Sequence, residues 1–252
     1  MVCFVMALKS EAVSRVWSRV SMLCEAAVQS AWRQTDRDIR IILVCHEKPD
    51  FRSTFDDRLE IIRVDFAVPV ADPKAAMLDK WKKLAVGMVR AGALSPDFVM
   101  NMDADDLVSN RIAAWARAHP RSNGAVIRRG YVYRPGSRWI AREDQYNCGT
   151  NAIVSARLIK FPKDISEQSV KECSILRSGH MTIEADMAQA GTPLDVLPFR
   201  AGIYVSGHGD NWSPSQRASP LARIKSFLKH PLRLRPCSAA IREEFAMQYL
   251  PT

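Results

Sequence analysis

Three carboxylates close together are the first residues of this chain that could do chemistry. Asp103, Asp105 and Asp106 directly follow the apolar run 98–102. Two carboxylates about 5 Å apart repel by roughly 3 kcal/mol at an effective dielectric near 20, and a divalent cation or a lysine relieves that repulsion. Carboxylate oxygens suit hard ions such as Mg²⁺ or Mn²⁺, which bridge protein carboxylates and substrate phosphates. We therefore expect Asp103 and Asp105 to bind a metal ion and phosphate, whereas for Asp106 we expect capping of the following helix.

The elements that must position these carboxylates follow a regular order in the first half of the chain. Nearly continuous apolar runs predict strands over 2–8, 39–45, 59–66 and 98–102. Apolar residues at three- and four-residue spacing predict helices over 11–34, 75–91 and 110–118. Ser10 is the expected cap of the first helix, and Glu25 and Gln29 stand between its apolar positions.

This alternation of strands and helices predicts an α/β fold, a three-layer sandwich with a mostly parallel central sheet. Ligands of such sheets bind at the carboxyl ends of the strands. Asp103 and its neighbours follow the carboxyl end of the fourth predicted strand, so the sequence predicts a ligand site there.

The second half of the chain is less regular. Strands are predicted over 125–133, 151–154 and 202–206, and a helix over 181–190 ends at Gly191. The final segment, 213–252, is basic and has a helical pattern interrupted by prolines. We therefore expect one main domain over 1–212 and a basic helical appendage over 213–252.

Composition and charge restrict the possible function. The 252 residues are 47% hydrophobic and 25% charged, which suits a globular protein, and no apolar run approaches the roughly 20 residues of a membrane span. Lysine and arginine exceed aspartate and glutamate by 36 to 27, a net charge of +9, and segment 213–252 contributes +5 of it. This excess favours an anionic partner, although a solvated basic surface explains it equally well.

Several kinds of site are excluded by missing motifs. No glycine is followed by lysine, no glycine precedes Gly87, and the pair His46-Glu47 lacks a second histidine. These absences argue against phosphate-loop hydrolases, dinucleotide oxidoreductases and zinc hydrolases. The six cysteines include no Cys-x-x-Cys pair and no secretory signal precedes them, so we expect reduced thiols and a cytoplasmic location. Segment 213–252 has few aromatic residues among its basic ones, and no nucleic-acid partner is expected.

A known family resembles this chain over about residues 2–212. The run Ser30-Ala31-Trp32-Arg33-Gln34-Thr35 before strand 39–45 resembles the first helix and second strand of family 2-like glycosyltransferases of the GT-A, or nucleotide-diphospho-sugar transferase, fold. Asp103-Ala104-Asp105-Asp106 resembles their Asp-x-Asp motif, and Cys148-Gly149-Thr150-Asn151-Ala152 resembles the short strand that faces the acceptor. The resemblance implies that 1–212 is a catalytic domain of this fold.

The resemblance also implies a nucleotide-diphosphate sugar donor and a bound Mn²⁺ or Mg²⁺. The cation would be held by Asp105 with Asp103, and by His208, a late histidine flanked by two glycines. Asp103 would also touch the nucleotide, as would Ala7, Lys9, His46 and Glu47 at the ends of the first two strands. The family more often has an aspartate near His46, so the donor base stays open.

Two further functions are implied for polar residues in helices. Lys80 and Lys83, three residues apart on one helix face, would lie near the donor phosphates, although a solvated helix face is the alternative. Transfer with inversion needs a base for the acceptor hydroxyl. Related enzymes place an acidic residue at the start of a helix after the acceptor strand, and the candidates here are Asp186 and then Glu184, with His180 just upstream.

The sequence thus predicts a metal-dependent, inverting glycosyltransferase that acts on a saccharide or lipid-linked acceptor. The alternative is a non-catalytic protein of the same fold that binds a nucleotide or sugar nucleotide. Segment 221–235 is basic and apolar, so it either contacts an anionic membrane surface, which would make a cytoplasmic protein peripheral to the membrane, or packs against the main domain.

Overall fold

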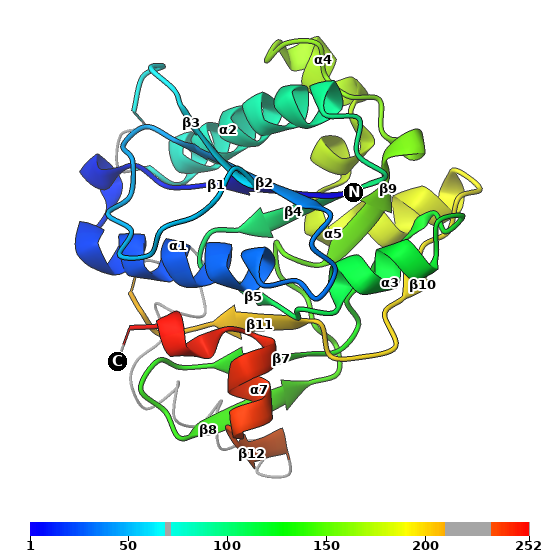
Figure 1. Ribbon diagram of the computed structural model, residues 1–252. Helices are drawn as coiled ribbons and strands as arrows, with labels where there is room; N and C mark the ends of the chain where they lie inside the picture. Colours follow the sequence, from blue (N-terminus) through cyan, green and yellow to red (C-terminus); the bar gives the residue numbers. More distant parts are fainter. Residues whose placement is uncertain (69–71, 210–232, 252) are drawn as a thin grey trace.

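A seven-stranded sheet forms the middle of the molecule (Figure 1). The computed structural model describes residues 1–68, 72–209 and 233–251. The strand order is β10-β6-β9-β4-β1-β2-β3, and only β9 runs against the other six among these strands. The strands are β1 (Val2–Ala7), β2 (Ile39–Cys45), β3 (Leu59–Arg63), β4 (Phe98–Asp103), β6 (Gly124–Val126), β9 (Ala152–Ser155) and β10 (Asp195–Val196). The predicted α/β class with a mostly parallel sheet is confirmed.

Helices cover both faces of this sheet. Alternate side chains of β1 illustrate it: Phe4 packs with α1 (Trp17–Trp32) and α3 (Ile112–Ala118), whereas Val5 packs with α2 (Pro73–Ala93) and α5 (Ser174–Gln189). Because side chains alternate along a strand, a strand that is covered on both faces must be apolar throughout. The continuous apolar runs of the sequence therefore reflect three layers, as predicted.

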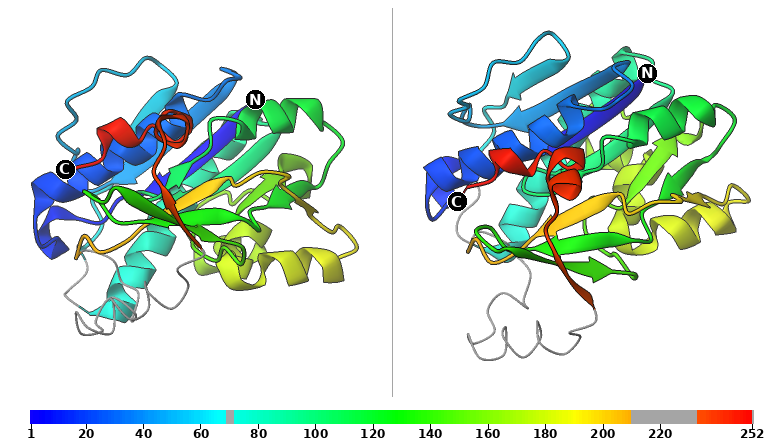
Figure 2. Two further views of the ribbon diagram at one scale, coloured as in Figure 1. Left: turned by 90° about the horizontal axis from the view of Figure 1, so that it is seen from below. Right: turned by 60° about the horizontal axis from the view of Figure 1, so that its bottom comes forward.

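A second, five-stranded sheet lies beside the first and has the order β12-β8-β7-β11-β5 (Figure 2). Its strands are β5 (Leu107–Val108), β7 (Gly130–Tyr133), β8 (Trp139–Glu143), β11 (Gly202–Val205) and β12 (Leu234–Pro236). The predicted strand 125–133 is in fact β6 and β7, which belong to different sheets. Sequence periodicity does not reveal a change of sheet, because both halves of the run are apolar.

Helix α1 is buried nearly all round because it lies between the two sheets. Leu23 and Ala26 pack against the second sheet, whereas Cys24 and Ala27 pack against the first. Glu25 and Gln29, which the sequence pattern placed between the apolar positions of a helix with one core face, are buried as well. Glu25 is accommodated because its carboxylate accepts hydrogen bonds from the backbone N–H groups of Arg52 (3.0 Å) and Ser53 (2.8 Å).

The first helix begins later than predicted. Ser10 caps a short 3₁₀ helix, η1 (Glu11–Val13), by accepting a hydrogen bond from Ala12 N at 3.3 Å. Val16 is extended, and α1 starts at Trp17. The remaining short elements are η2 (Ala156–Leu158), α4 (Glu167–Glu172), α7 (Ala239–Glu244) and η5 (Met247–Tyr249).

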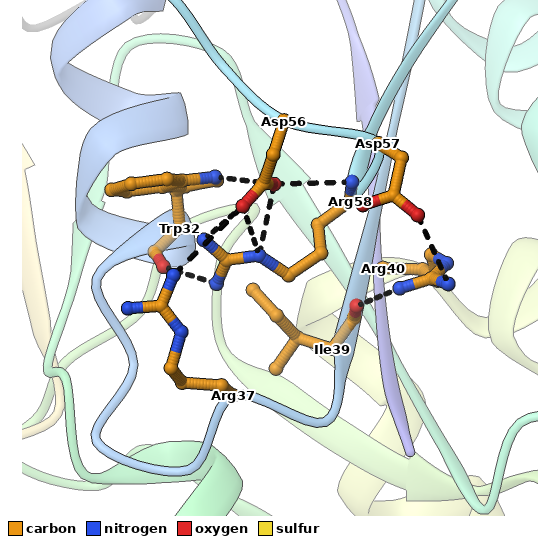
Figure 3. Close-up of polar contacts among 7 residues, drawn as sticks. All are labelled: Trp32, Arg37, Ile39, Arg40, Asp56, Asp57 and Arg58. Carbon is orange, nitrogen blue, oxygen red and sulfur yellow. Dashed lines mark hydrogen bonds and ion pairs between the residues drawn. The ribbon is translucent and has the colours of Figure 1, made fainter.

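The loop between β2 and β3 is fastened to the end of α1 by an aromatic and charged cluster (Figure 3). Asp56 accepts hydrogen bonds from Trp32 Nε1 at 3.0 Å and from Arg58 Nε at 2.9 Å. The guanidinium of Arg58 also lies 4.3 Å from the Trp32 ring centroid and donates to the Trp32 carbonyl at 3.1 Å. The cluster lies at the amino end of the parallel strands, and its charges are paired with one another, so it stabilises the loop.

The end of the chain packs on the second sheet and on α1. The red C-terminal segment lies against α1 (Figure 2). β12 pairs with β8, and Phe245 after α7 is fully buried with Leu23. The expected helical appendage 213–252 is described only over 233–251, where it contains a strand as well as helices; the domain boundary at 212 stays a prediction. The expected membrane contact of 221–235 lies outside the described residues except for its last three. Over 1–68, 72–209 and 233–251, no helix has the length and apolar character of a membrane span.

Candidate functional site

The carboxyl ends of β1 and β4 lie side by side in the central sheet. Ala7 is paired with Asp103 on one side and with Val44 on the other. Asp103 starts a tight turn, in which Asp106 N donates to Asp103 O at 3.2 Å, and Asp103 N donates to Thr150 Oγ1 at 2.9 Å. The carboxylates therefore lie at the edge of the sheet that the sequence predicted.

The Ser30, Gln34 and Thr35 motif holds the segment that follows this turn. Val108 N donates to Ser30 Oγ at 3.1 Å, and Gln34 Nε2 donates to Ser109 O at 2.9 Å. Gln34 Oε1 accepts from Ala113 N at 2.9 Å, and Thr35 Oγ1 donates to Asn110 O at 3.1 Å. These bonds fix the backbone on the far side of the turn, so the motif has a positioning role.

Lys80 from α2 forms an ion pair with Asp103. Burial lowers the pKa of Lys80, but the charges of Asp103, Asp105 and Asp106 raise it more, and its net pKa is above the ordinary value. Gly149 makes room for this pair, because a Cβ there would lie 2.6 Å from Asp103 Cγ. Lys80 thus lies beside the carboxylate turn, and its contact with donor phosphates stays a prediction.

Asp105 is held in an environment that disfavours its charge. Burial, followed by the charge of Asp103, raises the pKa of Asp105 to about 7, although Lys80 and Lys9 oppose the rise. Its side chain is 34% exposed, so the carboxylate is accessible from solvent. A carboxyl group of this kind gains from any cation that approaches it, because the cation favours the ionised form.

His208 approaches Asp105 from the end of β11. The imidazole Nε2 lies 3.2 Å from Asp105 Oδ2, and the residue is almost fully buried. Gly207 (φ 80°) and Gly209 (φ 85°) adopt the left-handed conformation that glycine favours, and this turn directs the imidazole inward. The structure therefore brings together two of the three predicted metal ligands, which are 103 residues apart in the chain.

Asp106 does not cap a helix, contrary to the expectation from its position. It is 1% exposed, and its Oδ2 lies 3.2 Å from the Sγ of Cys148, which donates to it. Burial and the charges of Asp105 and Asp103 raise its pKa well above the ordinary value, so the neutral acid is favoured. Asp106 has no helix to cap because β5 follows the turn directly and α3 begins only at Ile112.

Lys83 does not accompany Lys80 at the phosphate site. Its side chain is fully buried, and Nζ donates to Leu8 O and to Asp79 Oδ2, both at 2.7 Å. Burial lowers its pKa, and the ion pair with Asp79 opposes that effect. The predicted pair is wrong because residues three apart on a helix differ by about 60° in direction. Lys80 faces the edge of the sheet, and Lys83 ties the end of β1 to α2.

His46 and Glu47, the predicted nucleotide contacts after β2, both have local partners. His46 Nε2 lies 2.9 Å from the carbonyl of Phe66. The carboxylate of Glu47 accepts from Ser10 Oγ and Glu11 N, both at 3.0 Å. Glu47 therefore fixes the loop after β1, which includes Lys9.

A cavity of about 380 Å³ adjoins the carboxylate turn, between α2, β4, β9 and α5. Asp103, Lys80 and Gly149 line one part of it, and His180 lines it from α5. Gly179 (φ 59°, ψ 179°) interrupts α5 directly before His180. Burial lowers the pKa of His180, so its imidazole is neutral near pH 7.

The two predicted acidic bases are not among the residues that line this cavity. Glu184 forms an ion pair with Arg128. Hydrogen bonds from Ser178 and Thr182 lower the pKa of Asp186, which is half-buried. His180 precedes both on the same helix and directly follows the interruption at Gly179, where the chain enters the cavity lining.

Sequence reasoning missed the supporting roles of Cys148 and Thr150. Both belong to the short segment before β9 that the family resemblance singled out, and both contact the carboxylate turn. Within the part of the chain that the structure describes, no group of three or more histidine, cysteine, aspartate or glutamate side chains is arranged to hold a metal ion. Asp105 and His208 form a pair.

This chain is similar to known proteins in its structure but not in its sequence. No protein-family model matches the chain, and no curated protein matches its sequence. Among solved structures, TarS of S. aureus has 9% identity and a TM-score of 0.45 over 83% of this chain and 37% of TarS. The galactosyltransferase LgtC, in complex with donor and acceptor sugar analogs, has 13% identity and a TM-score of 0.40 over 96% of this chain and all of LgtC.

A third similar structure is the 4-diphosphocytidyl-2C-methyl-D-erythritol synthase of Anaerococcus prevotii. It has 11% identity and a TM-score of 0.40 over 91% of this chain and 96% of that one. The chain spans 37% and 60% of the two TarS structures that it matches.

Proposed function

We propose that this protein is a glycosyltransferase that transfers a sugar from a nucleotide-diphosphate donor. The observation that supports it best is the meeting of Asp103, Asp105, Lys80 and His208 at the carboxyl edge of a mostly parallel sheet. Crowded carboxylates beside a lysine and a histidine suit a phosphorylated ligand that arrives with a cation. The sequence resemblance to GT-A enzymes adds the sugar donor.

The residues fit a divalent cation such as Mn²⁺ or Mg²⁺. We assign Asp105 and His208 as its ligands, because Asp105 Oδ2 and His208 Nε2 are 3.2 Å apart and one ion could contact both atoms. Two protein ligands suffice for an ion that completes its shell with phosphate oxygens and water. When bound, the cation would neutralise charge on the leaving nucleoside diphosphate. Asp103, which is paired with Lys80, is in place to orient the turn and to contact the donor.

Lys80 acts on the same phosphates as a fixed positive charge. Its pKa is raised chiefly by Asp103, so it stays protonated throughout the neutral range. The diphosphate of the donor competes with Asp103 for the ammonium group of Lys80. Once Lys80 binds the phosphate, the Asp103 carboxylate can accept a hydrogen bond from a hydroxyl group of the sugar nucleotide.

His180 is our candidate for the general base in an inverting transfer. It is neutral near pH 7, it lines the cavity next to Asp103, and a neutral imidazole accepts a proton from an acceptor hydroxyl. Asp186 and Glu184 remain the alternatives from the sequence, and the ion pair of Glu184 with Arg128 counts against that residue.

Binding without turnover is the second candidate function. The pKa of about 7 for Asp105 fits it as well, because cation and nucleotide binding need no base. The two functions differ in what happens to the donor: only a transferase breaks the bond between sugar and diphosphate.

A thermal-shift screen followed by donor turnover tests both candidates. The full chain is heated with UDP, GDP, ADP or TDP, with and without Mn²⁺. A nucleotide at about 100 times its dissociation constant should stabilise the fold by about 2.7 kcal/mol, which for this size raises Tm by roughly 5–10 °C. The matching nucleotide sugar is then incubated and free diphosphate is measured. A cation-dependent shift with slow hydrolysis supports the transferase, a shift alone supports the binder, and no shift with any nucleotide contradicts both.

A further inference from the structure

The cavity beside the carboxylate turn is mainly apolar. Trp81 and Leu84 of α2 line it together with Ile175 and Ile183 of α5, and the last three are almost fully buried. Its volume of about 380 Å³ is at the lower end of small-molecule sites. A ligand there has mostly hydrocarbon to touch.

Several polar groups in the lining already have partners within the protein. Lys80 is paired with Asp103, and the side-chain amide of Asn151 donates to the carbonyl of His180 at 2.6 Å. The carbonyl oxygen of the Asn101 side chain, in contrast, is buried without a hydrogen-bond partner. The cavity thus offers few groups to a ligand with many hydroxyls, but enough to orient one.

The opening of the cavity is also apolar. Met77 on the first turns of α2 lines it and is 54% exposed, and Met181 on α5 lines it and is 74% exposed. Exposed thioethers are flexible and adapt to hydrocarbon of varied shape. The hydroxyl groups of a free saccharide would lose their hydrogen bonds to water in this cavity, and the thioethers, leucine and isoleucines would offer them no hydrogen-bond partner in exchange.

We propose that this cavity binds the acceptor, and that the acceptor is an alkyl-bearing alcohol or glycoside rather than a free sugar. The inference rests on the proposed transferase function, because the cavity shares Asp103 and Lys80 with the donor site. The alkyl chain lies between α2 and α5, and the acceptor hydroxyl lies beside His180 and Asp103. In the transfer, the hydroxyl oxygen forms the new bond to the sugar carbon, its proton passes to the base, and the bond from that carbon to the nucleoside diphosphate breaks.

Calorimetric binding of octyl β-D-glucoside, kept below its critical micelle concentration, tests the acceptor class, with methyl β-D-glucoside as the matched probe. Both are titrated into the full chain without nucleotide. We expect the octyl glucoside to bind at least tenfold more tightly than the methyl glucoside. Met77→Lys should weaken octyl glucoside binding at least tenfold. Leu78→Lys is the matched control, since Leu78 is 56% exposed and does not line the cavity.

Equal binding of the two glucosides, or equal effects of the two lysine variants, would overturn the assignment. The nucleotide thermal shift is measured on the same variants and should be the same in both, which shows that the donor site is intact. If the octyl glucoside binds as expected while no nucleotide gives a shift, the alkyl site stands and the transferase proposal fails. The two failures are therefore distinguishable.

Discussion

Replacing Asp105 by asparagine should stabilise the protein in the absence of metal while removing its response to metal. The pKa of Asp105 is raised from 3.8 to about 7 by burial and by Asp103. In the folded protein at pH 8 the group is ionised against that resistance. Asparagine has nearly the same shape and no charge, so it avoids this penalty.

The magnitude follows from the change in pKa. A rise of about three pH units at 1.36 kcal/mol each would destabilise the folded state at pH 8 by about 4 kcal/mol if the carboxylate were fully enclosed. The Asp105 side chain is 34% exposed, however, and solvent screening reduces the figure to about 1–2 kcal/mol. For a chain of this length that corresponds to a Tm increase of roughly 2–8 °C.

The effect has a defined pH dependence. Well below pH 4 the carboxyl is protonated in the folded and the unfolded states, and near pH 4, where it is only about half ionised in the unfolded state, the substitution still changes little. Between about pH 4 and 7 the unfolded state ionises first, so the wild type loses stability as the pH rises. Above about pH 7 both states are ionised and the advantage of asparagine is constant.

Thermal unfolding of the wild type and Asp105→Asn at pH 4 and pH 8, with and without Mn²⁺, measures the change in Tm, its pH dependence and its response to the metal. Asp57→Asn is the matched control, because the Asp57 side chain is 86% exposed and should give no change at either pH. Mn²⁺ should raise the Tm of the wild type and of the control but not of Asp105→Asn. A variant that is less stable than the wild type at pH 8, or equally shifted at both pH values, would refute the electrostatic reasoning.

Three other substitutions test separate parts of the structure. Gly149→Ala brings a methyl group against the Asp103 carboxylate and should weaken Mn²⁺-dependent nucleotide binding at least tenfold by calorimetry, with little change in circular dichroism. His180→Gln should lower kcat by about 10²-fold or more. The wild type should lose activity at acidic pH, with a midpoint below the ordinary histidine pKa because burial lowers the pKa of His180, and the variant should not show this loss. Asp186→Asn should keep the pH profile of the wild type. Phe245→Ala empties a fully buried site and should reduce the free energy of unfolding in urea by about 3–5 kcal/mol; a loss below 1 kcal/mol would contradict the packing described for the end of the chain.

The sequence was sufficient to predict the central sheet and the edge at which the carboxylates lie. β1, β2 and β4 are buried on both faces, so nearly all of their residues are apolar (Arg40 and Asn101 are exceptions within the strands), and such runs are easy to recognise. Asp103 follows the last of them directly. The predicted proximity of Lys80 and His208 to the same turn is also observed.

The sequence was insufficient wherever a second layer changed the environment of a residue. Glu25 and Gln29 are buried although the pattern placed them between apolar positions, and the N–H groups that bind Glu25 come from the loop after β2. Another face of α1 is covered by the five-stranded sheet, which is assembled from short strands far apart in the chain. Lys80 and Lys83 are three residues apart on one helix, and this spacing does not show which of the two side chains is buried in the protein. Such contacts are decided by tertiary packing, which a local pattern does not encode.

The pairing of β12 with β8 has a consequence for synthesis of the chain. Residues 234–236 form their hydrogen bonds with residues 139–141, and at about 5–20 residues per second roughly 5–20 s pass on the ribosome between these two segments. During that interval β1, β2 and β4 can already pair, but Leu23 and Ala26 on the outer face of α1 lack the cover that Phe245 and Met247 later supply. The nascent protein therefore exposes these apolar residues of α1 until Phe245 and Met247 have been synthesised.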